Sequence, residues 1–202
     1  MDTSKQLPNN MMLFMLNQME STLGRNGLTT VLKYSGLDRL VDSYPPRDFN
    51  PGEPLITFLT IIKNLMEIYG ENGYRAVMRG VGVQTFDEMR RELPWFFEVE
   101  DGALEGRTPA ERFGIMYSSY VDKAAQVFDS PPNLVVKPNE IIDITPASIW
   151  CFGLEAQKPI CIFPLDFYTG MARWMGVTEI SVVETHCRAS GDDVCRFVST
   201  FR

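Results

Sequence analysis

The chain has 202 residues, enough for one large domain or two small ones, and 45% of them are hydrophobic, so it can bury a core without disulfides. Its net charge of −7 argues against a nucleic-acid-binding protein, which normally has a basic face, and no polybasic stretch suits a membrane surface. No apolar run reaches the roughly 18 residues that span a bilayer, and no signal-peptide pattern opens the chain. We therefore expect a cytoplasmic protein whose four cysteines are reduced.

The first part of the chain carries helix patterns. Residues 1–8 are polar, and we expect a flexible N-terminus there. A helix is predicted from Asn9 or Asn10 to Leu23, where Gly24 ends it, and a second from Leu28 to Tyr34. The stretch from Ser43 to Gly52 is rich in proline and glycine, which predicts a loop.

Further helices are expected up to residue 128. An apolar stripe predicts a helix from Pro54 to Tyr69, and shorter ones follow at 72–78 and 85–93. Gly80-Val81-Gly82-Val83 lies between the last two and is interpreted as a helix stop. Thr108-Pro109-Ala110-Glu111 has the form of a capping box and predicts a helix that runs to Phe128.

The residue pattern changes after Pro131-Pro132, where β-branched residues become frequent. Apolar runs bounded by turn residues predict strands, and one amphipathic segment ending at a glycine predicts a helix. The expected strands are 134–136, 141–144, 148–152, 178–186 and 194–201, and the expected helix is 163–175.

This order of elements predicts an α+β fold, in which N-terminal helices pack on a C-terminal antiparallel sheet with one inserted helix. We expect a single domain over residues 9–202, with a helical part at 9–130 and a sheet part at 131–202. The amphipathic helices need the sheet to cover their apolar faces, which favours one domain over two.

The densest group of potential metal ligands lies near the end of the chain. Glu184, His186, Cys187 and Cys195 fall within twelve residues, and Cys161 lies upstream across one predicted helix and one predicted strand. Three thiols with Glu184 or His186 could form a closed tetrahedral zinc site. Glu184 and Cys187 are three positions apart, so both can bind one ion only if the strand bulges there. The alternative is a set of reduced cysteines buried as small apolar residues.

The same residues resemble a known family. The pattern Glu184-x-x-Cys187-Arg188-x-x-Gly191-x-x-x-Cys195, with Cys161 before it, is similar to the closing segment of the 4-vinyl reductase domain family, also called the hydrocarbon-binding domain. The stretch from Leu13 to Gly36 resembles its opening helices, so the likeness covers about residues 9–202. The family is similar in fold to TRAPP transport subunits and, more distantly, to heme nitric-oxide sensors.

This resemblance implies a structural zinc ion held by Cys161, Glu184, Cys187 and Cys195, as in the aromatic-sensing regulators of the family. His186 would then lie beside the site or at the surface. Cys151 has no counterpart in the pattern and is interpreted as a buried strand residue.

The resemblance also implies a pocket for a small hydrophobic or aromatic ligand between helices and sheet. Each aromatic side chain that could line it could equally belong to an ordinary core. The candidate ligand-binding residues are Tyr117, Tyr120, Trp150, Phe152, Phe163, Phe167, Tyr168 and Trp174.

We therefore expect a sensory or regulatory ligand-binding domain with no catalytic residues, paired as a homodimer through its N-terminal helices at Met12, Met15 and Met19. Two alternatives stay open: an enzyme or accessory protein acting on the vinyl group of a tetrapyrrole, and a structural assembly subunit like those of TRAPP. Whether the chain is an enzyme is undecided, although no nicotinamide or flavin fingerprint is present. A histidine-ligated heme is not expected, because the single histidine lies in a predicted strand.

Overall fold

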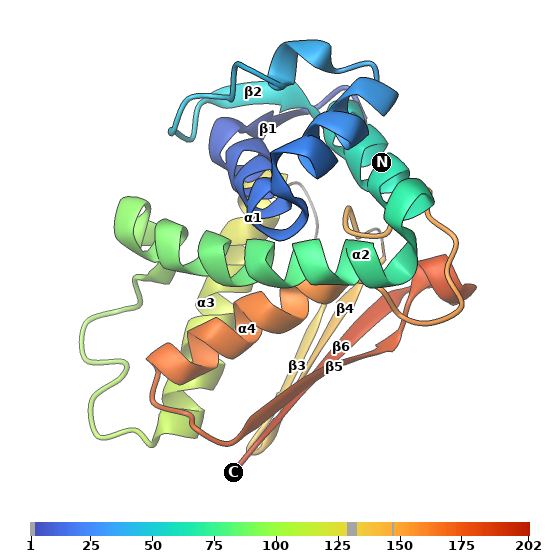
Figure 1. The fold of residues 1–202 in the computed structure, drawn as a ribbon. Helices are drawn as coiled ribbons and strands as arrows, with labels where there is room; N and C mark the ends of the chain where they lie inside the picture. Colours follow the sequence, from blue (N-terminus) through green and yellow to red (C-terminus); the bar gives the residue numbers. More distant parts are fainter. Residues whose placement is uncertain (1–2, 129–132, 147) are drawn as a thin grey trace.

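The structure is a computed structural model that describes residues 3–128, 133–146 and 148–202. None of the described helices is both long and apolar enough to cross a membrane. Four α-helices and six strands make up the described chain, with short 3₁₀ turns between some of them (Figure 1). In chain order they are β1 (Gln6–Pro8), α1 (Asn9–Tyr34), β2 (Pro51–Pro54), α2 (Leu55–Glu92), α3 (Pro109–Phe128), β3 (Leu134–Lys137), β4 (Glu140–Thr145), α4 (Ile162–Trp174), β5 (Ile180–His186) and β6 (Cys195–Phe201).

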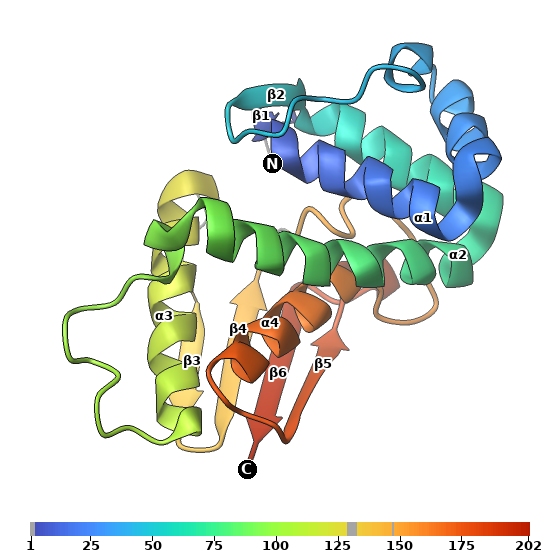
Figure 2. The same cartoon turned by 60° about the vertical axis from the view of Figure 1, so that its left-hand side comes forward.

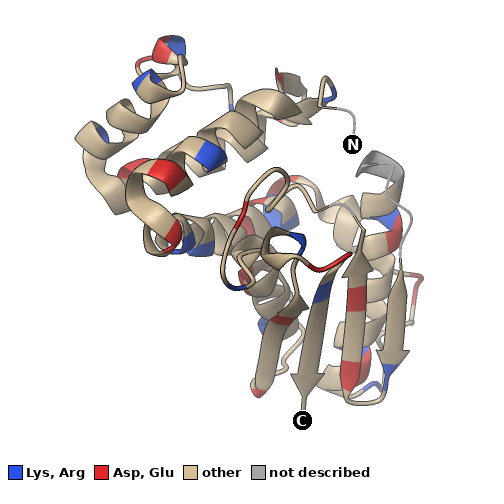
Figure 3. Cartoon of the chain, turned by 90° about the vertical axis from the view of Figure 1, so that its right-hand side faces the viewer, with Lys and Arg blue, Asp and Glu red and all other residues tan. Residues whose placement is uncertain are grey.

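A four-stranded antiparallel sheet in the order β3-β4-β6-β5 supports one side of the molecule. Helices α3 and α4 lie against one face of it, and α2 crosses over α4 on the side away from the sheet (Figures 1 and 2). Figure 3 shows the opposite face of the sheet, which no described helix covers. The predicted α+β fold, with helices packed on one face of an antiparallel sheet and one inserted helix, is confirmed.

The alternation of side chains along β4 and β6 decides what faces the helices. Every second residue of β6, from Cys195 through Phe197 to Phe201, is buried. Asp143 on β4 is paired with Phe197 and therefore points to the same helix-covered side. Glu184 on β5 is paired with Phe197 as well, so the sheet carries two acidic side chains toward an interior that is otherwise built largely from apolar residues.

A second, two-stranded sheet joins the N-terminus to the loop before α2. Sequence patterns predicted neither strand, because β1 falls in the expected flexible terminus and β2 begins inside the stretch that was predicted as a loop. Hydrogen bonds from the backbone N–H of Asn9 to the carbonyl of Asn50, and from that of Asn10 to the carbonyl of Asp48, continue this pairing into the first turn of α1. The start of α1 is therefore held in place by tertiary contacts.

Two glycines bend the long helices. Gly24 has φ 72° inside α1, and Gly70 has φ 66° inside α2, a left-handed backbone that glycine adopts without a side-chain clash. The predicted helix end at Gly24 is confirmed. The predicted stop at Gly80–Val83 is wrong, because α2 continues through it. Gly82 serves packing instead: a Cβ there would lie 2.5 Å from the carbonyl oxygen of Phe163, so the missing side chain lets α2 approach α4 closely.

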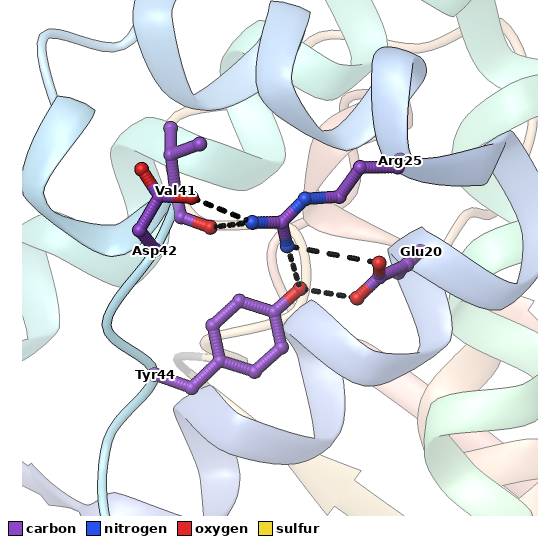
Figure 4. Close-up of polar contacts among 5 residues, drawn as sticks. All are labelled: Glu20, Arg25, Val41, Asp42 and Tyr44. Atoms are coloured by element: carbon purple, nitrogen blue, oxygen red, sulfur yellow. Dashed lines mark hydrogen bonds and ion pairs between the residues drawn. The ribbon is translucent and has the colours of Figure 1, made fainter.

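Polar contacts fasten the loop after α1 to the bend in that helix (Figure 4). The guanidinium of Arg25 pairs with Asp42 at 3.0 Å and with Glu20 at 3.6 Å, and it donates to the hydroxyl of Tyr44 at 3.1 Å. That hydroxyl donates to Glu20 at 2.5 Å, and burial, together with this carboxylate, raises the pKa of Tyr44 to about 12. The helix bend and its loop form one connected unit.

The capping box predicted at the start of α3 is present. The carboxylate of Glu111 accepts from the Thr108 N–H at 2.9 Å, and the Glu111 N–H donates to the Thr108 hydroxyl at 3.3 Å. The predicted strand at 148–152 is absent among the residues described there, where the chain makes turns that lead into α4. The predicted break at Pro131-Pro132 lies outside the described residues.

The three methionines expected at a dimer contact are buried inside the chain. Met12, Met15 and Met19 have no exposed surface and pack in the core between α1 and α2. These side chains cannot reach a second copy while α1 stays packed. The homodimer through the N-terminal helices stays a prediction, and other faces of these helices would have to carry it.

Candidate ligand pocket and thiol cluster

A cavity of about 590 Å³ lies between the start of α1, the second half of α2, α3, α4 and the inner face of the sheet. Pockets for small organic molecules usually have volumes of about 300–1,000 Å³ and apolar walls with a few polar groups. Its lining includes Leu7, Asn10, Met11, Phe14, Thr85, Met89, Trp95, Phe96, Tyr120, Ala124, Asp143, Ser148, Trp150, Phe163, Phe167, Tyr168 and Phe197.

Stacked aromatic rings form one wall of the cavity. The ring of Trp150 stacks on Phe163 with 3.7 Å between centroids, and Phe163 in turn lies 5.7 Å from Phe167 on the next turn of α4. Tyr120 of α3 reaches Phe167 at 4.9 Å from the other side. Residues from the turn before α4, from α4 and from α3 thus present a continuous aromatic surface to the cavity.

A buried carboxyl group lies in the lining beside this wall. The hydroxyl of Tyr168 donates to Oδ2 of Asp143 at 2.8 Å, and that of Tyr117 donates to the same oxygen at 3.3 Å. Burial raises the pKa of Asp143, although both hydrogen bonds act against the increase. Burial likewise raises the pKa of both tyrosines well above 10, so they remain hydrogen-bond donors at neutral pH.

Asn10 and Ser148 are two of the other polar residues that border the cavity, together with Lys5, Thr85, Asn133 and Thr145. Asn10, in the first turn of α1, is 1% exposed, and its side-chain oxygen has no hydrogen-bond partner among the described residues. The hydroxyl of Ser148 accepts from the Trp150 N–H at 3.3 Å and lies 3.5 Å from the sulfur of Cys161. The side-chain oxygen of Asn10 can therefore accept a hydrogen bond from a ligand. Ser148 contacts both Trp150 of the aromatic wall and Cys161.

The structure brings together five of the eight predicted pocket residues. Tyr120, Trp150, Phe163, Phe167 and Tyr168 line the cavity, and Tyr117 touches it only through Asp143. Phe152 and Trp174 do not line it and are 36% and 40% exposed. Sequence reasoning missed Asn10 and Asp143; the one usable signal was a lone acid in the apolar run of β4.

Next to the cavity, all four cysteines form a buried cluster. Their sulfur atoms lie within 4.8 Å of one another, with 3.4 Å between Cys151 and Cys195, 3.8 Å between Cys161 and Cys195, and 4.0 Å between Cys161 and Cys187. Metal–sulfur bonds of about 2.3 Å would place the sulfurs of a tetrahedral site about 3.8 Å apart. The thiols therefore have nearly the spacing that four ligands of one ion require.

Four separate backbone features position these thiols. Cys151 lies in the turns after β4, Cys161 immediately precedes α4, Cys187 follows β5, and Cys195 begins β6. The register of β5 shifts between Glu184 and His186, at the strand end where a bulge was expected if Glu184 and Cys187 were to bind one ion. Cys187, which follows this irregularity, is buried.

Cys151 occupies the place in the cluster that was predicted for Glu184. The carboxylate of Glu184 accepts from the backbone N–H of Cys161 at 2.8 Å, and its other oxygen is buried without a partner among the described residues. Burial first, and the neighbouring Cys187 second, raise the pKa of Glu184 to about 8. His186 is exposed at the end of β5.

The thiol cluster and the cavity share one short segment of chain. Trp150 lines the cavity and immediately precedes Cys151, and its carbonyl accepts a hydrogen bond from the buried hydroxyl of Tyr74. Cys161 precedes Phe163, on which Trp150 stacks. Anything that fixes the four sulfurs therefore also fixes the aromatic wall.

Comparison with known proteins identifies the fold. No family model and no curated protein sequence matches the chain. Among solved structures, an H-NOX protein from a study of heme distortion matches with a TM-score of 0.63 and 16% identity, over 97% of this chain and 95% of the other. A mutant of the iron(II), unliganded H-NOX protein from K. algicida matches with a TM-score of 0.61 and 14% identity, over 97% of each chain. An oxygen-binding H-NOX domain related to soluble guanylate cyclases matches with a TM-score of 0.54 and 17% identity, over 94% and 92%.

These matches correct two predictions. The chain resembles H-NOX domains, so its assignment to the 4-vinyl reductase family is wrong. Zinc as the cofactor is also overturned, because the matching structures are described as heme proteins.

A histidine-ligated heme does not fit the cavity of this chain either. His186 is the single histidine of the sequence and lies exposed at a strand end, whereas the cavity lining contains none. At such low identity the likeness concerns architecture alone, and by that architecture the chain has the fold of H-NOX domains.

Proposed function

We propose that the chain is a sensory domain that binds a small, largely apolar organic molecule in the cavity between its helices and sheet. The proposal rests on the cavity, which has a volume of about 590 Å³ and is bordered by aromatic rings and by few polar groups. Solved structures with the same fold are described as binding heme or oxygen, which supports a ligand-binding role but not the same ligand.

The proposal can be tested with N-phenylnaphthylamine, an apolar dye whose fluorescence rises when it leaves water. Ala124→Phe adds a ring inside the cavity from α3, while Asp122→Phe adds the same ring on the exposed side of that helix. We expect the wild-type protein and Asp122→Phe to bind the dye alike and Ala124→Phe to bind it about tenfold more weakly. Absence of binding, or unchanged binding by Ala124→Phe, would contradict the proposal.

We further propose that the thiols of Cys151, Cys161, Cys187 and Cys195 hold one thiophilic metal ion in a structural role. Their mutual spacing and complete burial support this, because four protein ligands leave no open position for a substrate. Glu184 would act beside the site by holding the backbone of Cys161 rather than as a ligand. Elemental analysis of the purified protein for all transition metals would identify the ion.

A further inference from the structure

Asp143 is a buried acid that forms no ion pair with any residue that the structure describes. Asp143 is 6% exposed, and no described Lys or Arg forms an ion pair with its carboxylate. The two tyrosine hydroxyls share Oδ2, and the hydrogen bonds of the described residues leave Oδ1 without a donor. An ionised carboxylate removed from water is costly unless a cation or several hydrogen bonds compensate for it.

Another buried acid of the same chain has its negative charge compensated by ion pairs. Glu88 on α2 is 5% exposed, and Arg47 and Arg91 both pair with its Oε1. The protein therefore surrounds one buried carboxylate with two guanidinium groups. It leaves the other without an ion pair among the described residues, although the exposed Lys5 also belongs to the lining of the cavity. This contrast suggests that the counter-charge of Asp143 comes from outside the chain.

The rest of the cavity suits a cation on an apolar body. Trp150, Phe163 and Tyr120 present aromatic surfaces, whose negative faces attract an ammonium group within about 6 Å of the ring centroid. Asn10 offers a buried side-chain oxygen that has no partner among the described residues. Both Asp143 and Asn10 thus present acceptors, so the complementary ligand is a hydrogen-bond donor.

We propose that the cavity binds an organic ammonium ion, a protonated amine carried by an aromatic or aliphatic body. The ammonium group pairs with Asp143, and the body lies against the ring of Trp150 and its neighbours. This inference rests on the proposed ligand-binding function and adds the chemical class of the ligand to it. The net charge of −7 favours the approach of such a cation from solution.

The test compares two ligands of nearly equal shape, phenethylamine and phenethyl alcohol, as competitors for bound N-phenylnaphthylamine at pH 7. Both carry a donor on the same aromatic body, but only the amine is charged. We expect the amine to displace the dye at about tenfold lower concentration. In Asp143→Asn, which keeps the shape of the side chain, this preference should disappear.

Asp166→Asn is the matched control. Asp166 is a partly buried acid of α4 whose pKa is also raised by burial, but it does not line the cavity. Its variant should keep the preference for the amine. If Asp143→Asn does not fold, the ratio measured on the wild-type protein still decides the question.

The possible failures are distinguishable. If the dye does not bind to the wild-type protein, the proposed function itself fails. If the dye binds and both competitors displace it equally, or if Asp143→Asn keeps the preference, the cavity binds apolar molecules and the ammonium inference is overturned.

Discussion

Trp150 stacks face to face on Phe163, with 3.7 Å between the ring centroids. Each ring is close in sequence to a cluster cysteine: Cys151 follows Trp150 directly, and Cys161 lies two residues before Phe163. The sulfur atoms of Cys151 and Cys161 belong to one buried cluster. The cavity wall is therefore built on the same segment that the thiols hold together.

This arrangement predicts that damage to the cluster weakens ligand binding. Cys151→Ala removes one thiol without entering the cavity, and the turn carrying Trp150 loses a fixed point. We expect binding of N-phenylnaphthylamine to weaken about threefold to tenfold, because ordering the wall then costs part of the binding free energy. Val183→Ala, on the uncovered face of the sheet, should leave binding unchanged, and equal affinity in Cys151→Ala would show that wall and cluster are independent.

A metal ion in the cluster should stabilise the fold directly. Binding free energy at a structural site is folding free energy, so Cys195→Ser should lose the ion and lower the free energy of unfolding by several kcal/mol. Elemental analysis and thermal melting measure the two effects, with Ser181→Ala on β5 as a control. Metal-free native protein, together with a Cys195→Ser variant that melts like the wild type, would reject the metal site.

Asp143 should make stability depend on pH in a definite direction. Burial raises its pKa, so between its value of about 3.9 in the unfolded chain and the higher folded value, the folded state binds more protons. The free energy of unfolding therefore falls as the pH rises through this window. Asp143→Asn lacks this titration, and its stability relative to the wild type should increase from pH 4 to pH 7 by about 1.4 kcal/mol for each unit by which the pKa is raised.

Urea unfolding at both pH values measures this change. Ser181→Ala, at an exposed position of β5 without a titratable side chain, should show no comparable trend. If the difference in the free energy of unfolding between Asp143→Asn and the wild type stays constant with pH, the pKa of Asp143 is not raised. If this difference decreases as the pH rises, the folded protein stabilises the carboxylate form of Asp143.

The close approach of α2 to α4 can be tested at Gly82. An alanine in a helix is intrinsically about 1 kcal/mol better than glycine, but at Gly82 its Cβ would lie 2.5 Å from the backbone oxygen of Phe163. We therefore expect Gly82→Ala to destabilise the protein by about 1–3 kcal/mol. At Gly80 the added Cβ meets only the end of the Gln18 side chain, which can move, so Gly80→Ala should be neutral or stabilising. Chemical denaturation of both variants measures the difference, and equal effects would argue against the helix contact.

The position of His186 leads to a prediction about heme. Its ring is exposed and lies beside the Thr185 hydroxyl, with 3.1 Å between Nδ1 and Oγ1, and it does not line the cavity. Protein incubated with hemin should therefore show no absorption spectrum of a histidine-ligated heme, and His186→Ala should give the same spectrum as the wild type. A histidine-type spectrum that disappears in His186→Ala would contradict this.

The order and type of most elements could be predicted from the sequence, because their signals are local. Thr108 and Glu111 form the capping box that their spacing predicts, and Gly24 bends α1 where the helix pattern is interrupted. Gly82 was misread because a glycine that ends a helix and a glycine that lets two helices touch look the same until the second helix is in place.

For the candidate site too, some residues could be predicted from the sequence and others could not. Sequence spacing pointed to Cys161, Cys187 and Cys195, with Glu184 or His186 as the expected fourth ligand. Only the tertiary structure added Cys151 to them and placed Asp143 beside a cavity. Cys151 matches no spacing pattern and was assigned to a strand that the structure does not contain. Asp143 reaches the cavity only because β4 pairs with β6 under the helices, and a long-range pairing of this kind leaves no local pattern in the sequence.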